Sequence, residues 1–390
     1  TTAQTVSALG ARLHQKGSVD KTCVPAPLAA RCAAMDEVLT RINAGAQRLF
    51  EEALRGDKTT VVAGDFAAMG RMMSDTLEAG RTEFTHHEAL GERIAAHLQR
   101  RGYTLESACV CGTARRQVLL RGLRLPGRHI KVRELRGILE GASKLALGEV
   151  RVTQTEDGRD YLFSARPKYA VRTVKQSRAK AGREGGYCGD SVTSLHDAKG
   201  NGIALLCDGM GSGNAAALCS ALSATVLSRL LRAGNRVDTS LRMLNGVLAA
   251  RGQRENEAST TVDLLEIDGV CGTGTFYKCG AAPSYLLRAG QITRFFSRTA
   301  PVGILETLDA ERISFEVQSG DVIVQVSDGV TGGEEECLWL AELLQSRWDG
   351  EAEKFARLIL NRASESGGDD LSVMITEVFD APEPGGEAAG

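Results

Sequence analysis

The sequence has no excess of charge of either sign, because 47 Lys and Arg side chains stand against 49 Asp and Glu, for a net charge of −2. A near-neutral chain has no general attraction to nucleic acid or to a membrane surface. Aromatic residues are also scarce, at 5%, and they are not interleaved with the arginines as base stacking would require, so no nucleic acid is expected as a partner. No stretch is predicted to be apolar for the length that a membrane span needs.

The cysteines lack the pairing that a disulfide framework or a zinc site would need. Ten of them are scattered through 390 residues, and several, such as Cys207 and Cys279, lie inside apolar runs. They are therefore expected to be reduced and buried. Cys109 and Cys111 form the only close pair in the sequence, and no second pair is present to complete a structural zinc site.

The length allows two or three domains, and changes in hydrophobic periodicity divide the chain into four parts. These are an N-terminal helical segment (1–57), an α/β domain (58–160), a larger strand-rich domain (161–380) and a disordered tail rich in Pro, Gly and Glu (381–390). In the α/β domain, strands are predicted at 60–63, 107–111, 116–122 and 149–154, and helices at 66–80, 88–101 and 132–147.

The larger domain is predicted as stacked antiparallel strands with helices before and after them. Its strands are expected at 203–207, 259–267, 272–280, 284–289, 291–296, 314–317, 321–327 and 371–379. Its helices are expected at 215–233, 239–251, 338–348 and 352–363. The segment 175–189 is polar and glycine-bearing, and it is interpreted as a hairpin loop that leads into Asp190.

The α/β domain also carries many arginines, for which a solvated sheet face or a protein contact is the favoured interpretation. They are Arg100, Arg101, Arg115, Arg116, Arg121, Arg124, Arg128, Arg133 and Arg136.

The chain is organised around an apolar run, Ile203 to Cys207, that ends in Asp208 and a cluster of glycines. The run predicts a strand covered on both faces, and the glycines allow a tight turn into a helix. A strand, a glycine-rich loop and a helix also resemble a dinucleotide-binding unit. However, the glycine spacing differs from Gly-x-Gly-x-x-Gly, and an acid precedes the loop where it would repel a pyrophosphate.

Four aspartates share one local pattern, an acid at the end of a strand beside glycine or a second acid: Asp190, Asp208, Asp328 and Asp369, the last followed by Asp370. Carboxylates gathered at one sheet edge repel one another unless a cation neutralises them, and sites with oxygen ligands alone suit Mg²⁺ or Mn²⁺. Two such ions about 3.5–4 Å apart can activate water for attack on phosphorus. The pattern therefore predicts hydrolysis of a phosphoester.

Four motifs occur in the order Gly189-Asp-Ser, Asp208-Gly-Met-Gly-Ser-Gly, Ser327-Asp-Gly and Asp369-Asp-Leu-Ser. In this order they resemble the metal-binding signatures of the PPM (type 2C) Ser/Thr protein phosphatases. The stretches that begin at Thr260, Phe276 and Ala300 narrow the resemblance to the bacterial stage II sporulation protein E branch of that family. The resemblance is strong over 166–379 and less specific over 59–155.

The resemblance implies an α+β fold, a PPM-type β-sandwich of two antiparallel sheets flanked by helices, preceded by a smaller α/β regulatory domain and N-terminal helices. It also implies two Mn²⁺ or Mg²⁺ ions. Asp208 would bridge both ions, Asp190 and the Gly209 carbonyl would hold one, and Asp328 and Asp369 would hold the other. Asp370 would lie just outside the ligands.

The resemblance does not identify a basic phosphate clamp. Three residues before Asp190 are candidates for it: Arg172, Lys175 and Arg178. The resemblance further implies that residues 1–155 regulate the site by shifting the helix that follows Asp208.

The implied substrate is a phosphoserine on an anti-sigma-factor antagonist protein, in a pathway that activates a sporulation sigma factor. A homodimer contact through residues 1–160 is a further expectation. The chain begins at Thr1 without Met, and it is expected to act in the cytoplasm as part of a protein whose membrane segment precedes it. Two alternatives stay open: a stress-response phosphatase of the same branch, and a catalytically silent binding module with a phosphatase-like fold.

Overall fold

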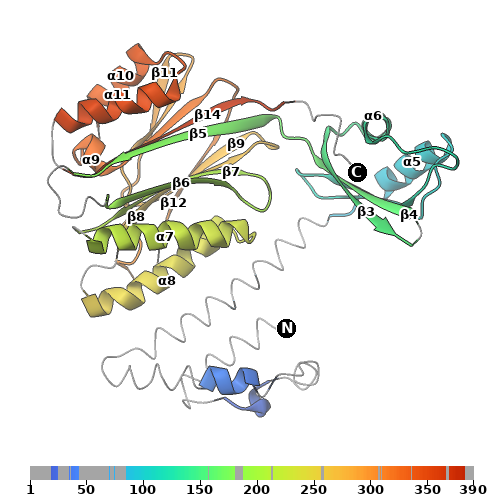
Figure 1. Ribbon diagram of the computed structural model, residues 1–390, viewed down its shortest axis with the longest axis horizontal. Helices are drawn as coiled ribbons and strands as arrows, with labels where there is room; N and C mark the ends of the chain where they lie inside the picture. The colour runs from blue at the N-terminus through green and yellow to red at the C-terminus, as the bar shows by residue number, and fades with distance from the viewer. Residues whose placement is uncertain are drawn as a thin grey trace.

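The computed structural model describes residues 19–24, 35, 37–43, 70, 74, 85–156, 158–180, 188–211, 214–255, 259–305, 308, 310–334, 336–365 and 369–382. The expected strand at 60–63 lies outside these residues, as do most of the helix expected at 66–80 and most of the tail expected at 381–390. Two parts are well defined in space, a small domain and a larger β-sandwich beside it (Figure 1).

The small domain is a four-stranded antiparallel sheet with two helices on one face, in the strand order β1-β2-β4-β3. Its elements are α5 (Glu88–Gln99), β1 (Ser107–Cys111), β2 (Gln117–Leu123), α6 (Val132–Ser143), β3 (Leu147–Thr155) and β4 (Gly158–Ala165). Apolar residues at helical spacing, such as Ile94, Leu98, Leu135 and Leu139, are fully buried against the sheet. Burial of these side chains gives this domain a hydrophobic core of its own.

The sandwich consists of two five-stranded antiparallel sheets, in the orders β12-β9-β8-β7-β6 and β11-β10-β13-β14-β5. The first sheet contains β6 (Asp190–His196), β7 (Gly202–Gly209), β8 (Thr260–Asp268), β9 (Thr273–Cys279) and β12 (Glu311–Glu316). The second contains β5 (Tyr169–Arg178), β10 (Ser284–Arg288), β11 (Gln291–Phe295), β13 (Val322–Val326) and β14 (Leu371–Asp380).

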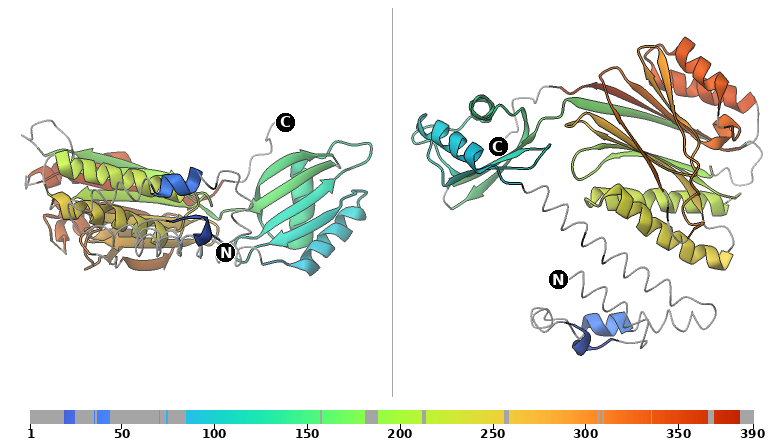
Figure 2. Two further views of the ribbon diagram at one scale, coloured as in Figure 1. Left: turned by 90° about the horizontal axis from the view of Figure 1, so that it is seen from below. Right: turned by 180° about the vertical axis from the view of Figure 1, so that it is seen from behind.

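Helices cover the outer face of each sheet (Figures 1 and 2). The first sheet is covered by α7 (Asn214–Arg232) and α8 (Val237–Glu255), and the second by α10 (Leu338–Arg347) and α11 (Ala352–Glu365), with the short α9 (Asp328–Thr331) at the end of β13. A separate apolar layer that includes Leu206, Phe276 and Met374 fills the space between the sheets. This architecture confirms the expected α+β sandwich and excludes the dinucleotide-binding alternative, because β7 is antiparallel to both of its neighbours.

The structure corrects the sequence analysis at several elements. β4 runs to Ala165 within the small sheet, so that sheet extends past the boundary expected at residue 160. The first four residues of the expected loop at 175–189 are the end of β5. α7 is long and apolar enough to cross a membrane by length and composition, contrary to expectation. It packs on β6 and β7 instead. None of the nine cysteines within the described residues forms a disulfide, as expected, but the expected burial holds only for Cys207, Cys219, Cys279 and Cys337, and Cys271 is exposed.

Candidate functional site

Asp190 and Asp208 lie side by side at one edge of the first sheet. β6 and β7 are antiparallel, and their register places Asp190 directly opposite Asp208. Side chains alternate along a strand, so Asp208 shares the inward face of β7 with Leu206, which belongs to the layer between the sheets. Both carboxyl groups therefore lie at the open end of the space between the sheets.

Gly209 is required by the close approach of α7 to the end of β7. A Cβ atom at residue 209 would lie 2.0 Å from the carbonyl oxygen of Ala216, which no real side chain could tolerate. Two hydrogen bonds fix this corner: the Gly209 N–H donates to the Gly189 carbonyl (3.2 Å), and the Thr260 hydroxyl donates to the Asp208 carbonyl (2.8 Å). The corner between strand and helix is thus built by glycine and by a neighbouring strand.

Asp328 and Asp369 reach the same edge from the second sheet. Asp328 is the first residue of α9, directly after β13, and Asp369 precedes β14. The two segments touch at Gly329, where a Cβ would lie 2.1 Å from the Asp370 carbonyl oxygen and 3.3 Å from the Asp369 Cβ. Both acidic side chains are exposed, so they form the rim of the site, whereas Asp190 lies beneath it.

Asp370 is buried and has a structural role that the sequence analysis left unspecified. Its Oδ1 accepts the N–H of Lys180, and its Oδ2 accepts the N–H of Gly189, each at 2.7 Å. One carboxylate therefore closes both ends of the connection between β5 and β6, and it fixes the residue that precedes Asp190. That Asp370 lies outside the ligand set stays a prediction.

Two acidic side chains of the site, Asp208 and Asp190, have raised pKa values. Burial, followed by the charges of Asp190 and Asp328, raises the pKa of Asp208 to about 9. Burial also raises the pKa of Asp190 to about 6, although the hydroxyls of Ser372 and Ser327 oppose the shift. Both serines stand in the motifs Ser327-Asp-Gly and Asp369-Asp-Leu-Ser, although the sequence analysis assigned neither of them a role.

The donor set suits a hard divalent cation, although the site is not preformed. Asp190 Oδ2 is buried and has no hydrogen-bond partner, which is a costly arrangement unless a cation or water binds there. Over the described parts of the chain, no three His, Cys, Asp or Glu side chains converge as a metal-binding group. Asp190 and Asp328 nevertheless lie close enough to Asp208 to raise its pKa, with Asp369 beside the start of α9. The roles of these four residues as ligands stay a prediction.

Two of the three candidate basic residues of β5 have side-chain partners in the structure. Arg172 forms an ion pair with Glu377 on β14 (2.6 Å), and β14 begins at the acidic edge and carries Glu377 toward the far end. Arg178 lies at the acidic end of β5 but donates to Ser364 and Asn361 of α11 (2.6 and 2.9 Å). Arg172 is therefore not suited to act as the phosphate clamp.

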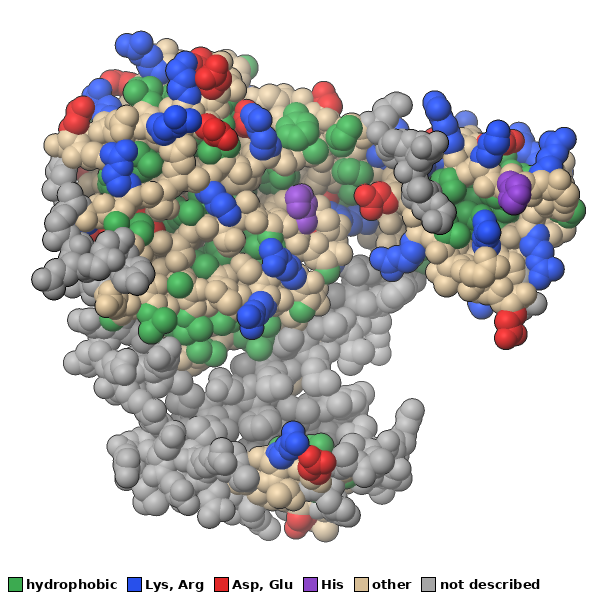
Figure 3. Space-filling model, viewed as in Figure 1, with side chains coloured by type: hydrophobic (Ala, Val, Ile, Leu, Met, Phe, Trp, Pro, Cys, Tyr) green, Lys and Arg blue, Asp and Glu red, His purple; other side chains and the backbone are tan. Residues whose placement is uncertain are grey.

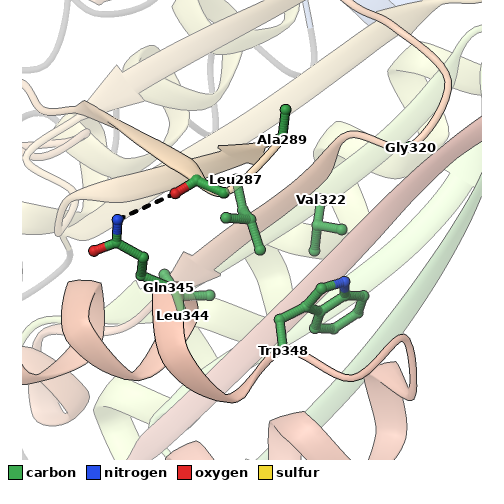
Figure 4. A pocket seen from close by; sticks show the side chains of 8 residues that line it. Leu287, Ala289, Gly320, Val322, Leu344, Gln345 and Trp348 are labelled. Carbon is green, nitrogen blue, oxygen red and sulfur yellow. Dashed lines mark hydrogen bonds between the residues drawn. The ribbon is translucent and has the colours of Figure 1, made fainter.

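A pocket of about 310 Å³ lies at the opposite end of the second sheet from Asp328, and its lining contains no charged side chain. Figure 4 shows Leu287, Val322 and Leu344 facing this space, with Trp348 at its edge. Gln345 Nε2 donates to the Gly290 carbonyl across it (3.2 Å). The pocket lacks the acidic groups of the site described above, so we do not assign it to the same chemistry.

Comparison with known proteins agrees with this geometry. Residues 199–379 match the family described as Stage II sporulation protein E (SpoIIE). The chain is similar to Stage II sporulation protein E of Bacillus subtilis (strain 168), with 27% identity over 224 residues, which are 55% of this chain and 27% of that protein. The protein of the same name from Priestia megaterium is 24% identical over 247 residues, or 60% of this chain and 42% of that one. The chain therefore spans less than half the length of these relatives.

A solved structure supports the assignment of the fold. It contains the PP2C phosphatase domain and a fragment of the regulatory domain of the cell fate determinant SpoIIE from Bacillus subtilis, and it superposes with a TM-score of 0.62 at 22% identity. The match covers 88% of this chain and all of that one. The PP2C phosphatase fold thus describes the sandwich of the present chain.

Proposed function

We propose, because residues 199–379 match the Stage II sporulation protein E family, that this chain is a metal-dependent protein phosphatase that hydrolyses phosphoserine on a regulatory partner protein. The observation that carries the proposal is the juxtaposition of Asp190 and Asp208 across β6 and β7, with Asp328 close enough to raise the pKa of Asp208. A cluster of carboxylates that destabilise one another is typical of a site built for function rather than for stability.

In this proposal two Mn²⁺ or Mg²⁺ ions are held by the residues that the motifs predict. Asp190, Asp208 and the Gly209 carbonyl would hold one ion, and Asp208, Asp328 and Asp369 would hold the other. The bound ions would supply the positive charge that polarises a phosphoryl group and acidifies water. The proposal draws support from the orphaned Asp190 Oδ2 and from a donor set that contains only oxygen.

The chain's own residues orient this site. Asp370 holds the backbone on either side of the β5–β6 connection, and Thr260 fixes the Asp208 carbonyl. The rim position of Asp328 and Asp369 leaves the site open to a side chain carried by another protein. On the family relationship, we propose that this partner protein, which is the substrate, is an anti-sigma-factor antagonist. We also propose that the present chain acts in the cytoplasm.

The test is hydrolysis of p-nitrophenyl phosphate and of a phosphoserine protein, with Mn²⁺ and with chelator, by the full chain and by Asp208→Ala and Asp328→Ala. We expect both variants to lose nearly all Mn²⁺-dependent turnover. Asp349→Ala serves as the matched control, because Asp349 is a surface partner of Lys354 near the start of α11. Equal turnover by Asp208→Ala and the control would exclude the proposed site.

Stability measurements separate loss of function from loss of fold. Without metal, Asp208→Ala removes a buried carboxyl group that its neighbours destabilise, so its melting temperature should equal or exceed that of the unmodified chain. A chain that binds Mn²⁺ yet hydrolyses neither substrate would instead support the alternative of a silent, phosphatase-like binding module.

A further inference from the structure

We propose that the sandwich carries a preformed binding pocket for a guanidinium group, and that Arg115 of the small domain occupies this pocket and holds the two domains in one orientation. The pocket lies at the end of β7 opposite to Asp208, because β7 begins at Gly202 beside the pocket and ends at Gly209. It is therefore separate from the acidic site.

Arg115 lies in the turn between β1 and β2 and reaches across to two turns of the sandwich. Its Nε donates to Asp268 Oδ2 (3.1 Å), and its Nη2 lies 2.8 Å from Asp268 Oδ1. The remaining contacts are to the Lys199 carbonyl and to Asn201 Oδ1. All the partners are acceptors, and the two-point contact with Asp268 matches the fork of a guanidinium group, which a lysine ammonium cannot reproduce.

The acceptors of the pocket are held in place by the sandwich itself. The Asn201 side-chain amide donates to Asp197 Oδ2 (3.1 Å) and Glu266 Oε1 (2.9 Å), which leaves its Oδ1 directed at Arg115. Asp268 Oδ1 accepts the N–H groups of Val270 and Cys271, each at 2.9 Å. Asn201 is also nearly fully buried, with 5% of its surface exposed. The pocket is thus organised without any contribution from the small domain.

Charge at the pocket is consistent with a bound cation. Burial alone would raise the pKa of Asp268, yet its pKa lies below the ordinary value because Arg115 and the backbone of Cys271 stabilise the carboxylate. The Arg115 side chain keeps 25% of its surface exposed, so water and salt can compete for it. The contact is therefore strong enough to select one orientation and weak enough to be displaced.

The covalent connection between the domains passes the same place. The N–H groups of Lys168, which precedes β5, and of Tyr169, its first residue, donate to the Gly269 carbonyl at 2.7 and 3.1 Å. This contact fixes where β5 begins, and the Arg166 N–H donates to the Ala146 carbonyl of the small domain (3.0 Å), so only Pro167 separates the two anchored residues. Arg115 supplies a second point of attachment. Two points of attachment fix the orientation of the small domain relative to the sandwich, whereas a single point would allow it to rotate.

The small domain carries many arginines besides Arg115, and one of them can serve as a control. Figure 3 shows Lys and Arg side chains over the visible face of this domain. Arg121, on the same hairpin, is exposed, so it provides a matched control of equal charge.

The experiment compares the full chain with Arg115→Ala, Arg115→Lys and Arg121→Ala by small-angle X-ray scattering and by hydrogen–deuterium exchange. For Arg115→Ala we expect a larger radius of gyration. Amide exchange in the turns at 197–201 and 268–272 should be about tenfold faster, as expected for losing one partly exposed, charge-assisted contact. Arg115→Lys should recover only part of the protection, and Arg121→Ala should match the unmodified chain.

Millimolar methylguanidinium then tests the pocket separately from the domain contact. In Arg115→Ala it should restore protection of the two turns without restoring the radius of gyration, and methylammonium at equal ionic strength should do neither. Unchanged scattering and exchange in Arg115→Ala would overturn the proposed attachment. Equal protection by methylguanidinium and methylammonium would overturn the guanidinium pocket. Neither readout uses phosphatase activity, so these outcomes are independent of the proposed function.

Discussion

The buried ion pair between Lys278 and Asp263 gives the sharpest test of how the sandwich is held together. Both side chains have 0% exposure, and Lys278 Nζ lies 2.9 Å from Asp263 Oδ2. Lys278 also donates to the Ala282 carbonyl (2.7 Å) and to the Ser284 hydroxyl (2.9 Å). Because β9 and β10 belong to different sheets, Lys278 secures the segment that crosses from one sheet to the other.

We consider the substitution Lys278→Met, which keeps the length of the side chain and removes its charge. Asp263 then loses its cation and keeps only one hydrogen bond to its carboxylate, from Ser284 at 2.5 Å, while its Oδ1 has no partner already. Breaking a buried pair in this way costs about 3–5 kcal/mol, whereas replacing both partners with apolar groups is often neutral. The unfolding equilibrium should shift by roughly two to three and a half orders of magnitude, at 1.4 kcal/mol per tenfold.

Urea unfolding followed by tryptophan fluorescence measures this effect within the sandwich. The chain has two tryptophans, Trp339 in α10 and Trp348 directly after it, and Trp348 packs edge-on against Phe355 with ring centroids 5.4 Å apart. The signal therefore reports the sandwich rather than the small domain. The double variant with Asp263→Val should regain most of the stability that Lys278→Met loses.

The pH dependence of the single variant identifies the cause. An uncompensated buried carboxyl group has its pKa raised above the unfolded value, so the Lys278→Met protein should be less destabilised at pH 5 than at pH 8. A loss of stability that is independent of pH, or a double variant as unstable as the single one, would refute the account based on unpaired charge.

Three further outcomes follow from the acidic edge. Gly209→Ala places a Cβ 2.0 Å from the Ala216 carbonyl oxygen. It should lower the free energy of unfolding by about 1–3 kcal/mol in thermal unfolding and reduce Mn²⁺-dependent activity. The control Gly141→Ala, on α6, adds a Cβ with nothing within 4 Å and should leave the stability unchanged or raise it. Asp370→Asn leaves one backbone N–H of the β5–β6 connection facing an amide donor, so melting experiments should show a loss of about 1–3 kcal/mol. Since the pKa of Asp208 is raised to about 9 without metal, Mn²⁺ binding at pH 7.5 should release protons and strengthen with rising pH, which calorimetry in buffers of different ionisation enthalpy will measure.

Periodicity predicted most elements of the sandwich because buried strands leave a strong local signal. The segment expected at 203–207 is the centre of β7, whose first six residues are buried. β5 was missed because it is an edge strand whose exposed polar residues Arg172, Lys175 and Ser177 are distributed over both of its faces and interrupt the apolar alternation. α9 has only four residues, and so short a helix has no periodicity to detect.

The residues of the candidate site could be predicted where a local motif marks them, but not where their role depends on contacts distant in the sequence. Each acidic motif is a short pattern at the end of a strand, so the four aspartates were identifiable in the sequence, and the antiparallel pairing then brings two of them face to face. The role of Asp370 depends on two N–H groups more than 180 positions earlier in the chain. No spacing rule encodes such a contact.

The role of Arg115 could not be predicted at all, because nothing in the local sequence distinguishes Arg115 from Arg116. What selects it is the position of the β1–β2 turn relative to Asn201 and Asp268, which lie 86 and 153 positions away. A local sequence pattern cannot predict the role of an arginine whose partners belong to another domain. That role is recognised only in the structure, where the acceptors around the arginine are held in place by hydrogen bonds of their own. The same reasoning implies that an arginine on a partner protein could compete for this pocket, because its acceptors would remain in place after Arg115 had left.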